Sequence, residues 1–278
     1  MNLFRLFVYS VVFSASLVFS KASWAYIPPS EYIVKNMLQK KAALKQFRSR
    51  GVVMALTSEG RLAGPRFTEE VTYDSKTGAL RSVALDEEGR ELYSVERSLV
   101  KDSHERDPKT LISMILFESR AGLVIPQLKK WEIPVKQEDE LLKLATEAER
   151  RAAERTFLGR QKTSAGLQVS WVIGEKNSNQ LWIEKDVFLP TRLNFKFSDE
   201  YTVQFDSYRT VKEVLFPRVI TVSKGAEQIF RQELQDFTVN SGASADNSKA
   251  VVGGFTETGE SAESELRELI RKYYSVIR

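Results

Sequence analysis

Residues 166–239 constrain this chain most, because apolar and polar residues alternate along them in segments that turn signals separate. A period of two places successive side chains on opposite faces of a strand, so each segment predicts a half-buried β-strand. Val169, Trp171 and Ile173 share one face of the first segment, and Leu181 and Ile183 share a face of the next. The series predicts one antiparallel sheet whose apolar face needs a cover of helices, a second sheet or a ligand.

Further strand-like segments precede this region. They cover residues 51–56, 67–74, 79–86 and 90–99, and short turns that contain glycine join them. Such short connections predict that neighbouring strands pair as a meander.

Helical patterns flank and interrupt the strands. A helix is predicted from Ser30 onward, and a second begins at Asp107-Pro108, with the acid as N-cap and proline at the first helical position. The second helix, over residues 108–121, is apolar nearly all round, which is typical of a helix sunk in the core or laid over an apolar concavity as a lid. We interpret residues 123–135 as an irregular connection and predict a third helix over residues 138–155.

The C-terminal part combines a predicted flexible linker with a predicted amphipathic helix. Residues 241–262 are rich in Ser, Gly, Ala and Thr, as linkers are. In residues 263–278 an apolar stripe runs from Leu266 to Ile277 at helical spacing. This stripe can dock on its own domain, on a partner or on a membrane surface.

The N-terminus has the pattern of a secretory signal. Arg5 precedes an apolar run over residues 6–19, and Ser23-Trp24-Ala25 is a cleavage site of the A-x-A type. An uncleaved anchor is the alternative, but the run is shorter than the roughly 20 apolar residues that a spanning helix needs. We predict cleavage after Ala25 and an exported mature chain that begins at Tyr26.

Composition excludes several function classes. The chain has no cysteine, so disulfides, thiolate metal sites, a cysteine nucleophile and a lipid-modified cysteine are all excluded. The net charge is +4, and removal of Arg5 and Lys21 with a signal that contains no acid leaves +2. Basic and acidic residues are interspersed, which does not favour a nucleic-acid partner.

No catalytic, metal or cofactor site stands out. The single histidine, His104, lies in a polar loop, and no Gly-x-Ser-x-Gly turn marks a nucleophile. Adjacent acids such as Glu69-Glu70 fall in turns, on strand surfaces or in a first helical turn, where solvation explains them. Walker and Gly-x-Gly-x-x-Gly loops are absent, so we predict a protein that is not an enzyme and has no cofactor.

Bulky side chains are the remaining candidates for a site. The sheet residues are either core or the lining of a cavity for an apolar ligand, and a curled sheet permits both. Together with apolar residues of the helix over 108–121, the candidates for the hydrophobic cavity are Trp171, Trp182, Phe195, Phe197, Tyr201, Phe205, Ile112, Ile115 and Leu116.

A family resemblance rests on residues 180–218. The run Gln180 to Asp186, the run Leu189 to Leu193, Val203-Gln204-Phe205 with Tyr208, and Leu215-Phe216-Pro217-Arg218 resemble the outer-membrane lipoprotein carrier superfamily (LolA/LolB-like). The order of elements over about residues 30–239 is similar as well. The Arg-Pro pair expected in an early strand is absent, since Arg66 is followed by Phe67. A helix-latching role for that arginine therefore does not carry over.

The resemblance implies an α+β fold, with a curled antiparallel sheet (an unclosed β-barrel), an N-terminal helix and a helical lid. The predicted parts are a cleaved signal peptide over 1–25, a half-barrel domain over 26–240, the linker over 241–262 and the helix over 263–278. It also implies a periplasmic carrier that holds acyl chains of a lipoprotein or lipid for transfer toward the outer membrane. Partners would be those chains and membrane-bound transfer proteins, with transient membrane contact. The alternative is an envelope regulatory or interaction module that binds a protein through the sheet edge or the C-terminal helix.

Overall fold

The computed structural model describes residues 27–57, 59–136, 140–141, 143–144, 146, 149, 155–163, 166–241 and 261–278. The predicted signal peptide, most of the predicted helix over 138–155 and nearly all of the predicted linker lie outside these residues. Of the helices within these ranges, none combines the length and the apolar character needed to span a bilayer.

A single antiparallel sheet forms the body of the molecule, and its strands lie in the order β4-β3-β2-β1-β11-β10-β9-β8-β7-β6-β5. The strands are β1 (Gln46–Leu56), β2 (Leu62–Asp74), β3 (Ala79–Leu85), β4 (Glu91–Ser98), β5 (Thr156–Thr163), β6 (Gly166–Ile173), β7 (Gln180–Glu184), β8 (Pro190–Lys196), β9 (Glu200–Val211), β10 (Val214–Lys224) and β11 (Glu227–Val239). Two meanders meet where β1 pairs with β11, with Phe47 opposite Val239. Strands β4 and β5 lie at opposite edges of this order, so the curled sheet is an unclosed barrel, as the family resemblance implied.

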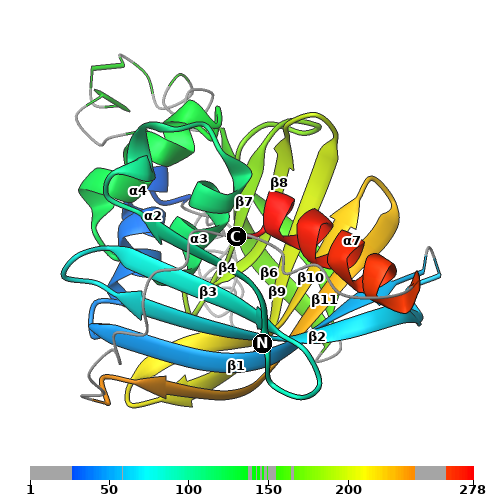
Figure 1. The fold of residues 1–278 in the computed structure, drawn as a ribbon. Coiled ribbons are helices and arrows are strands. Elements are labelled where there is room, and N and C mark those ends of the chain that lie inside the picture. Colours follow the sequence, from blue (N-terminus) through cyan, green and yellow to red (C-terminus); the bar gives the residue numbers. More distant parts are fainter. Residues whose placement is uncertain are drawn as a thin grey trace, which may run out of the picture.

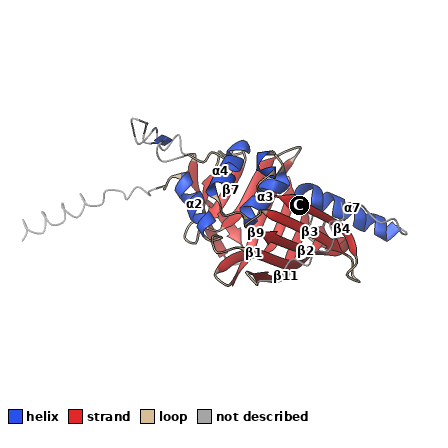
Figure 2. Cartoon of the chain, turned by 60° about the vertical axis from the view of Figure 1, so that its left-hand side comes forward, coloured by secondary structure: helices blue, strands red, loops and turns tan. Residues whose placement is uncertain are grey.

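Helices cover the concave face of this sheet (Figure 1). They are α2 (Ser30–Gln39), α3 (Pro108–Phe117), α4 (Ala121–Lys130) and α7 (Ser261–Val276), with a short 3-10 turn η1 (Asp102–His104) before α3. Figure 2 shows the helices along one side of the strands. The predicted start of α3 is confirmed, since the Asp107 side chain accepts a hydrogen bond from the Lys109 N–H with Pro108 at the first position.

Two local predictions were wrong. Strand β5 was not predicted, because its residues, TFLGRQKT, show little alternation. Residues 121–130 form helix α4 instead of an irregular connection, although Pro126 lies inside it. Burial of Val124, Ile125 and Leu128 outweighs the local breakers, since tertiary packing supplies most of a helix's stability.

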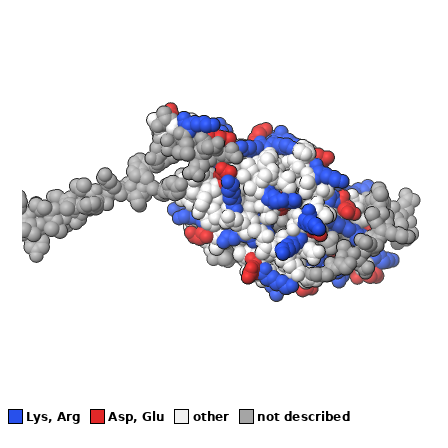
Figure 3. All heavy atoms as spheres, turned by 90° about the vertical axis from the view of Figure 1, so that its left-hand side faces the viewer, with Lys and Arg blue, Asp and Glu red and all other residues white. Residues whose placement is uncertain are grey.

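The core is one apolar cluster that fills the curl of the sheet and joins it to all four helices. Strand β3 shows how alternation builds it, because every second side chain is buried along Ala79–Leu85. The predicted C-terminal helix is confirmed as α7, and it docks on its own domain, with Leu269, Ile270 and Tyr273 buried. On the face drawn in Figure 3, Lys and Arg lie among acidic and uncharged residues without a continuous basic stripe.

Candidate functional site

The hollow of the half-barrel is the candidate site, and an apolar row crosses its floor from β7 to β10. Leu181 lies opposite Leu193, Leu193 opposite Val203, and Val203 opposite Val222. All four side chains are buried. The inner face of the sheet therefore presents a continuous apolar surface to whatever occupies the hollow.

Helix α3 occupies the middle of this hollow. Every one of its residues from Thr110 to Phe117 is buried. The helix contacts the core on all sides, which explains why its sequence is apolar nearly all round. Its last residue, Phe117, packs against Phe47 of β1 and Phe216 of β10, with ring centroids 5.2 and 5.4 Å apart. Of the two arrangements that the sequence left open for this helix, the structure has the one sunk in the core.

Six of the nine candidate cavity residues are buried in the core around α3: Trp171, Phe195, Phe205, Ile112, Ile115 and Leu116. Tyr201 is half-buried, stacks on Phe195 at 5.4 Å and lines an open cavity. Phe197 is 58% exposed at the end of β8, where its ring lies 6.1 Å from that of Trp131.

Trp182 belongs to the other face of the sheet. Its strand neighbours Leu181 and Ile183 point into the hollow, so alternation turns Trp182 outward. There the indole lies beside Gly159, where an added Cβ would come within 2.5 Å of the ring. The Arg192 guanidinium lies 5.4 Å from the ring centroid.

An open cavity of about 510 Å³ lies between α7 and the ends of the central strands. Its walls come from β1, β2, β9, β10, β11 and α7. The apolar lining consists of Ala55, Leu56, Pro65, Ile229, Phe230, Leu269 and Val276. The rest of the lining is polar or charged: Tyr201, Lys224, Glu227, Glu265, Glu268, Lys272 and Ser275. Among the candidate residues from the sequence, only Tyr201 is part of it.

The sequence reasoning missed most of this lining. Phe230 continues the alternation of the predicted sheet, and Leu269 belongs to the apolar stripe of the C-terminal helix, so both carried a signal. No pattern along the chain indicated that the strand with Phe230 and the helix with Leu269 face each other. Leu56 and Pro65 come from the first meander, which the sequence did not connect with the site.

A polar cluster lies buried beneath the end of α7. Glu69 of β2 is fully buried, so the predicted solvation of this acid was wrong. Its carboxylate accepts hydrogen bonds from the Ser82 hydroxyl at 2.6 Å and the Tyr273 hydroxyl at 2.9 Å. The Gln232 amide also donates to it. The Arg278 Nε lies 2.9 Å from Glu69 Oε1. Burial raises the pKa of Tyr273 well above its usual value, so the hydroxyl remains a donor to the carboxylate.

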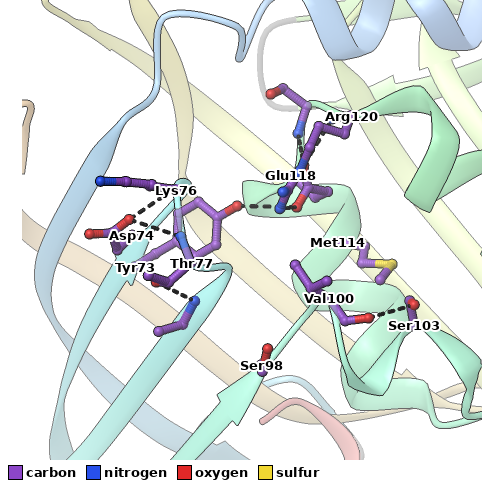
Figure 4. Close-up of polar contacts among 12 residues, drawn as sticks. Tyr73, Asp74, Lys76, Thr77, Ser98, Val100, Ser103, Met114, Glu118 and Arg120 are labelled. Atoms are coloured by element: carbon purple, nitrogen blue, oxygen red, sulfur yellow. Dashed lines mark hydrogen bonds and ion pairs between the residues drawn. The ribbon is translucent and has the colours of Figure 1, made fainter.

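A second polar cluster surrounds the C-terminal end of α3 (Figure 4). Arg120 Nη2 lies 2.6 Å from Glu118 Oε2, and the Tyr73 hydroxyl donates to the same carboxylate at 3.3 Å. Burial alone would raise the pKa of Glu118, but hydrogen bonds from Arg120 and Ser119 lower it below its usual value. Close by in the core, the Lys41 ammonium donates to the Ile115 carbonyl at 2.6 Å. Burial lowers the pKa of Lys41 to about 7, against the opposing charge of Glu118.

Both polar clusters pair charged groups within the protein interior. Each charged group in them pairs with another group or with backbone, and none opens into the 510 Å³ cavity as a part of its lining. His104 is exposed at the end of η1. Within the part of the chain that the structure describes, no three His, Cys, Asp or Glu residues lie where they could share a metal ion.

Comparison with known proteins gives structural neighbours only. No family model matches the sequence, and no curated protein matches it. A chain from Vibrio parahaemolyticus, described as an outer membrane lipoprotein-sorting protein domain, is 8% identical, with 78% of this chain and 94% of that chain covered and a TM-score of 0.43. A LolA superfamily protein from Nitrosomonas europaea is also 8% identical, with coverages of 77% and 95% and a TM-score of 0.43. A DUF1329 family protein from Desulfovibrio piger is 10% identical, with coverages of 79% and 95% and a TM-score of 0.39.

The Nitrosomonas europaea neighbour is described as a LolA superfamily protein, and residues 180–218 of this chain resemble the same superfamily. Similarity at this level carries no conclusion about ligand or partner, so the case for function rests on the residues of this chain.

Proposed function

We propose that this chain is a periplasmic binding protein that holds an acyl chain of a lipoprotein or lipid in the hollow of its half-barrel and releases it toward the outer membrane. The observation that supports this is the 510 Å³ cavity at the hollow, with its apolar lining. Its volume falls in the range of about 300–1,000 Å³ that is usual for small-molecule sites. In this proposal the chain acts by binding and release, without chemistry on the ligand.

The lining suits a ligand with an apolar tail and a polar head. Leu56, Ile229 and Phe230 offer apolar contact, and each methylene removed from water contributes about 0.8 kcal/mol. Lys272 pairs with Glu268 at 2.7 Å, and Lys224 pairs with Asp199 at 2.9 Å. These pairs are largely exposed, so a polar head beside them would remain in water. A single acyl chain held in this way would bind reversibly, as transfer requires.

The experiment is a titration of the full chain with a fluorescent fatty acid, in the wild type and in two tryptophan variants. Ala55 is half-buried on the inner face and lines the cavity, so Ala55→Trp should fill the cavity and lower probe affinity by about tenfold or more. Met54, the preceding residue, faces the opposite side of β1, so Met54→Trp is the matched control and should leave affinity unchanged.

Two results would count against the proposal. One is the absence of probe binding to the wild type, together with a clean apo mass for protein purified gently from its own envelope. The other is equal affinity in Ala55→Trp and Met54→Trp when both variants melt like the wild type.

The alternative, an interaction module that works through the C-terminal helix, has less support. The apolar stripe that a partner would use begins at half-buried Leu266, and its other members are buried against this chain's own domain: Leu269, Ile270, Tyr273 and Ile277. The outer edges of β4 and β5 are the places where a partner strand could add to the described sheet.

A further inference from the structure

Helix α7 enters the hollow at an angle, and its burial increases toward its end. Glu265 and Glu268 near its start are exposed, whereas Tyr273, Ile277 and Arg278 are buried. Figure 1 shows the helix, in red, crossing over the strands to the middle of the molecule. The last turn therefore fills apolar space of the hollow directly beside the cavity that the proposed function assigns to a ligand, and α7 forms one wall of that cavity.

Aromatic contacts seat this last turn on the inner face of the sheet. The Tyr273 ring meets Phe67 of β2 and Phe230 of β11 edge to face, with centroids 5.5 and 5.9 Å apart. The Tyr274 ring lies 4.7 Å from that of Tyr93 of β4. An apolar chain placed on the same strands would need the surface that these rings now cover.

A buried ion pair fixes the position of the helix end. Arg278 is 3% exposed and Glu69 is fully buried, and both the Nε and the Nη2 of Arg278 donate to the carboxylate, at 2.9 and 3.3 Å. The guanidinium also lies 5.9 Å from the ring centroid of Phe117, where α3 ends. Taking two charges out of water is costly, and such pairs are best known for specifying one arrangement among several apolar ones.

The pair also makes the docked state sensitive to loss of one partner. If Arg278 is removed, Glu69 stays in the core with Ser82, Gln232 and Tyr273 as neutral donors only. An uncompensated buried charge is strongly destabilising, and release of α7 would expose the carboxylate to water. The Glu69–Arg278 pair thus holds the end of α7 in its docked position inside the apolar hollow.

We propose that α7 is an internal occupant of the hollow that competes with the acyl ligand, and that the Glu69–Arg278 pair sets how often the hollow is free. This proposal rests on the proposed function, because it concerns the same hollow. A ligand that binds only the free hollow has an apparent affinity reduced by the fraction of molecules in which the hollow is free. Loading would displace Tyr273 and Ile277, and release of the ligand would let the helix return.

Hydrogen exchange on the full chain tests the competition directly, with a fluorescent fatty acid as the probe. Binding of a ligand normally slows exchange around its site. We expect the probe to slow exchange in β9–β11 and to speed it in residues 261–278, because the helix leaves. Slower exchange in both regions would overturn the proposal, since the probe would then lie beneath a docked helix.

Arg278→Ala tests the latch. It should raise probe affinity by about tenfold and speed exchange of α7 without the probe. Arg271→Ala is the matched control, because it removes the same charge from the exposed side of the same helix and should change neither quantity. Tyr273→Phe removes one hydrogen bond to Glu69 while keeping the ring, and should give a smaller rise in affinity.

The possible failures are distinguishable. No probe binding to the wild type or to any variant would refute the proposed function, and the competition with it. Probe binding that is equal in Arg278→Ala and in the wild type, while α7 exchanges faster in the variant, would refute only the competition. Unchanged exchange of α7 in Arg278→Ala would refute the latch.

Discussion

Replacing Lys41 with methionine should make the stability of this protein less dependent on pH. Lys41 is 5% exposed, and its ammonium donates to the carbonyls of Ile115 and Met114 in the last turn of α3. The Met114 carbonyl also accepts the Glu118 N–H, so the lysine caps the end of the helix chiefly through the Ile115 carbonyl. The position of this ammonium in the core is the reason for its altered pKa.

The expected magnitude follows from the difference between two pKa values. The pKa of Lys41 is lowered from 10.5 to about 7 in the folded chain, chiefly by burial. Between these two values the unfolded chain holds a proton that the folded chain has lost, so the free energy of unfolding rises with pH. Below about pH 7 Lys41 is protonated in both states, and the folded state bears the full free-energy cost of burying the charged ammonium. Above about pH 10.5 the penalty is gone. At about 1.4 kcal/mol per pKa unit, the difference between the two pKa values changes the free energy of unfolding by about 5 kcal/mol across this pH range.

The assay is urea denaturation of the wild type and of Lys41→Met at several pH values from about 6 to about 10.5. The quantity to follow is the difference in free energy of unfolding between the two proteins, which removes the titration of all other groups. We expect the free energy of unfolding of the wild type, relative to that of the variant, to rise by about 5 kcal/mol from the lowest to the highest pH of this range. Lys40→Met is the control, because Lys40 is the exposed neighbour and should give a constant difference. A constant difference for Lys41→Met as well would show that burial of Lys41 does not make the stability depend on pH.

Two further predictions concern packing and backbone hydrogen bonds. Gly159→Ala should destabilise the fold by about 1–3 kcal/mol in urea, because the new methyl would lie 2.5 Å from the Trp182 ring and 2.6 Å from Val172 Cγ2. Gly122→Ala in α4 meets open space and is its control, and equal stability of the two variants would show that Trp182 moves aside. Asn240→Ala should cost about 1–3 kcal/mol, because the side chain accepts from the N–H groups of Lys45 and Gln46 and donates to the Ala43 carbonyl. Hydrogen exchange at the start of β1 should then be faster than in the Ser241→Ala control, and unchanged exchange there would contradict this role.

The burial of the aromatic residues decides which substitutions can test ligand binding. A charge at Phe195 or Phe205, two of the cavity candidates from the sequence, would not test ligand retention alone. Both side chains are buried beside α3, so a charge there would remove core contacts and leave an unpaired ion in the protein interior. Cavity-lining residues that are only half-buried, such as Ala55 and Tyr201, are the better probes of binding.

Local patterns predicted the elements better than the contacts between them. Alternation located the strands between residues 166 and 239, and Asp107-Pro108 located the start of α3, because both signals come from neighbouring residues. Alternation also implied that Trp182 faces away from Leu181 and Ile183. Its inclusion among the cavity candidates followed residue type instead of strand position.

From the sequence alone follow an antiparallel sheet with one apolar face, an apolar helix after Asp107 and an amphipathic helix over residues 263–278, because period and capping are properties of short stretches. What fills the hollow depends on contacts between segments that are far apart in the chain. The Glu69–Arg278 pair joins residues 209 positions apart, and the Lys41–Ile115 hydrogen bond joins residues 74 apart. No local pattern encodes such contacts, since they exist only once the two meanders pair through β1 and β11 and the helices pack into the curl between them.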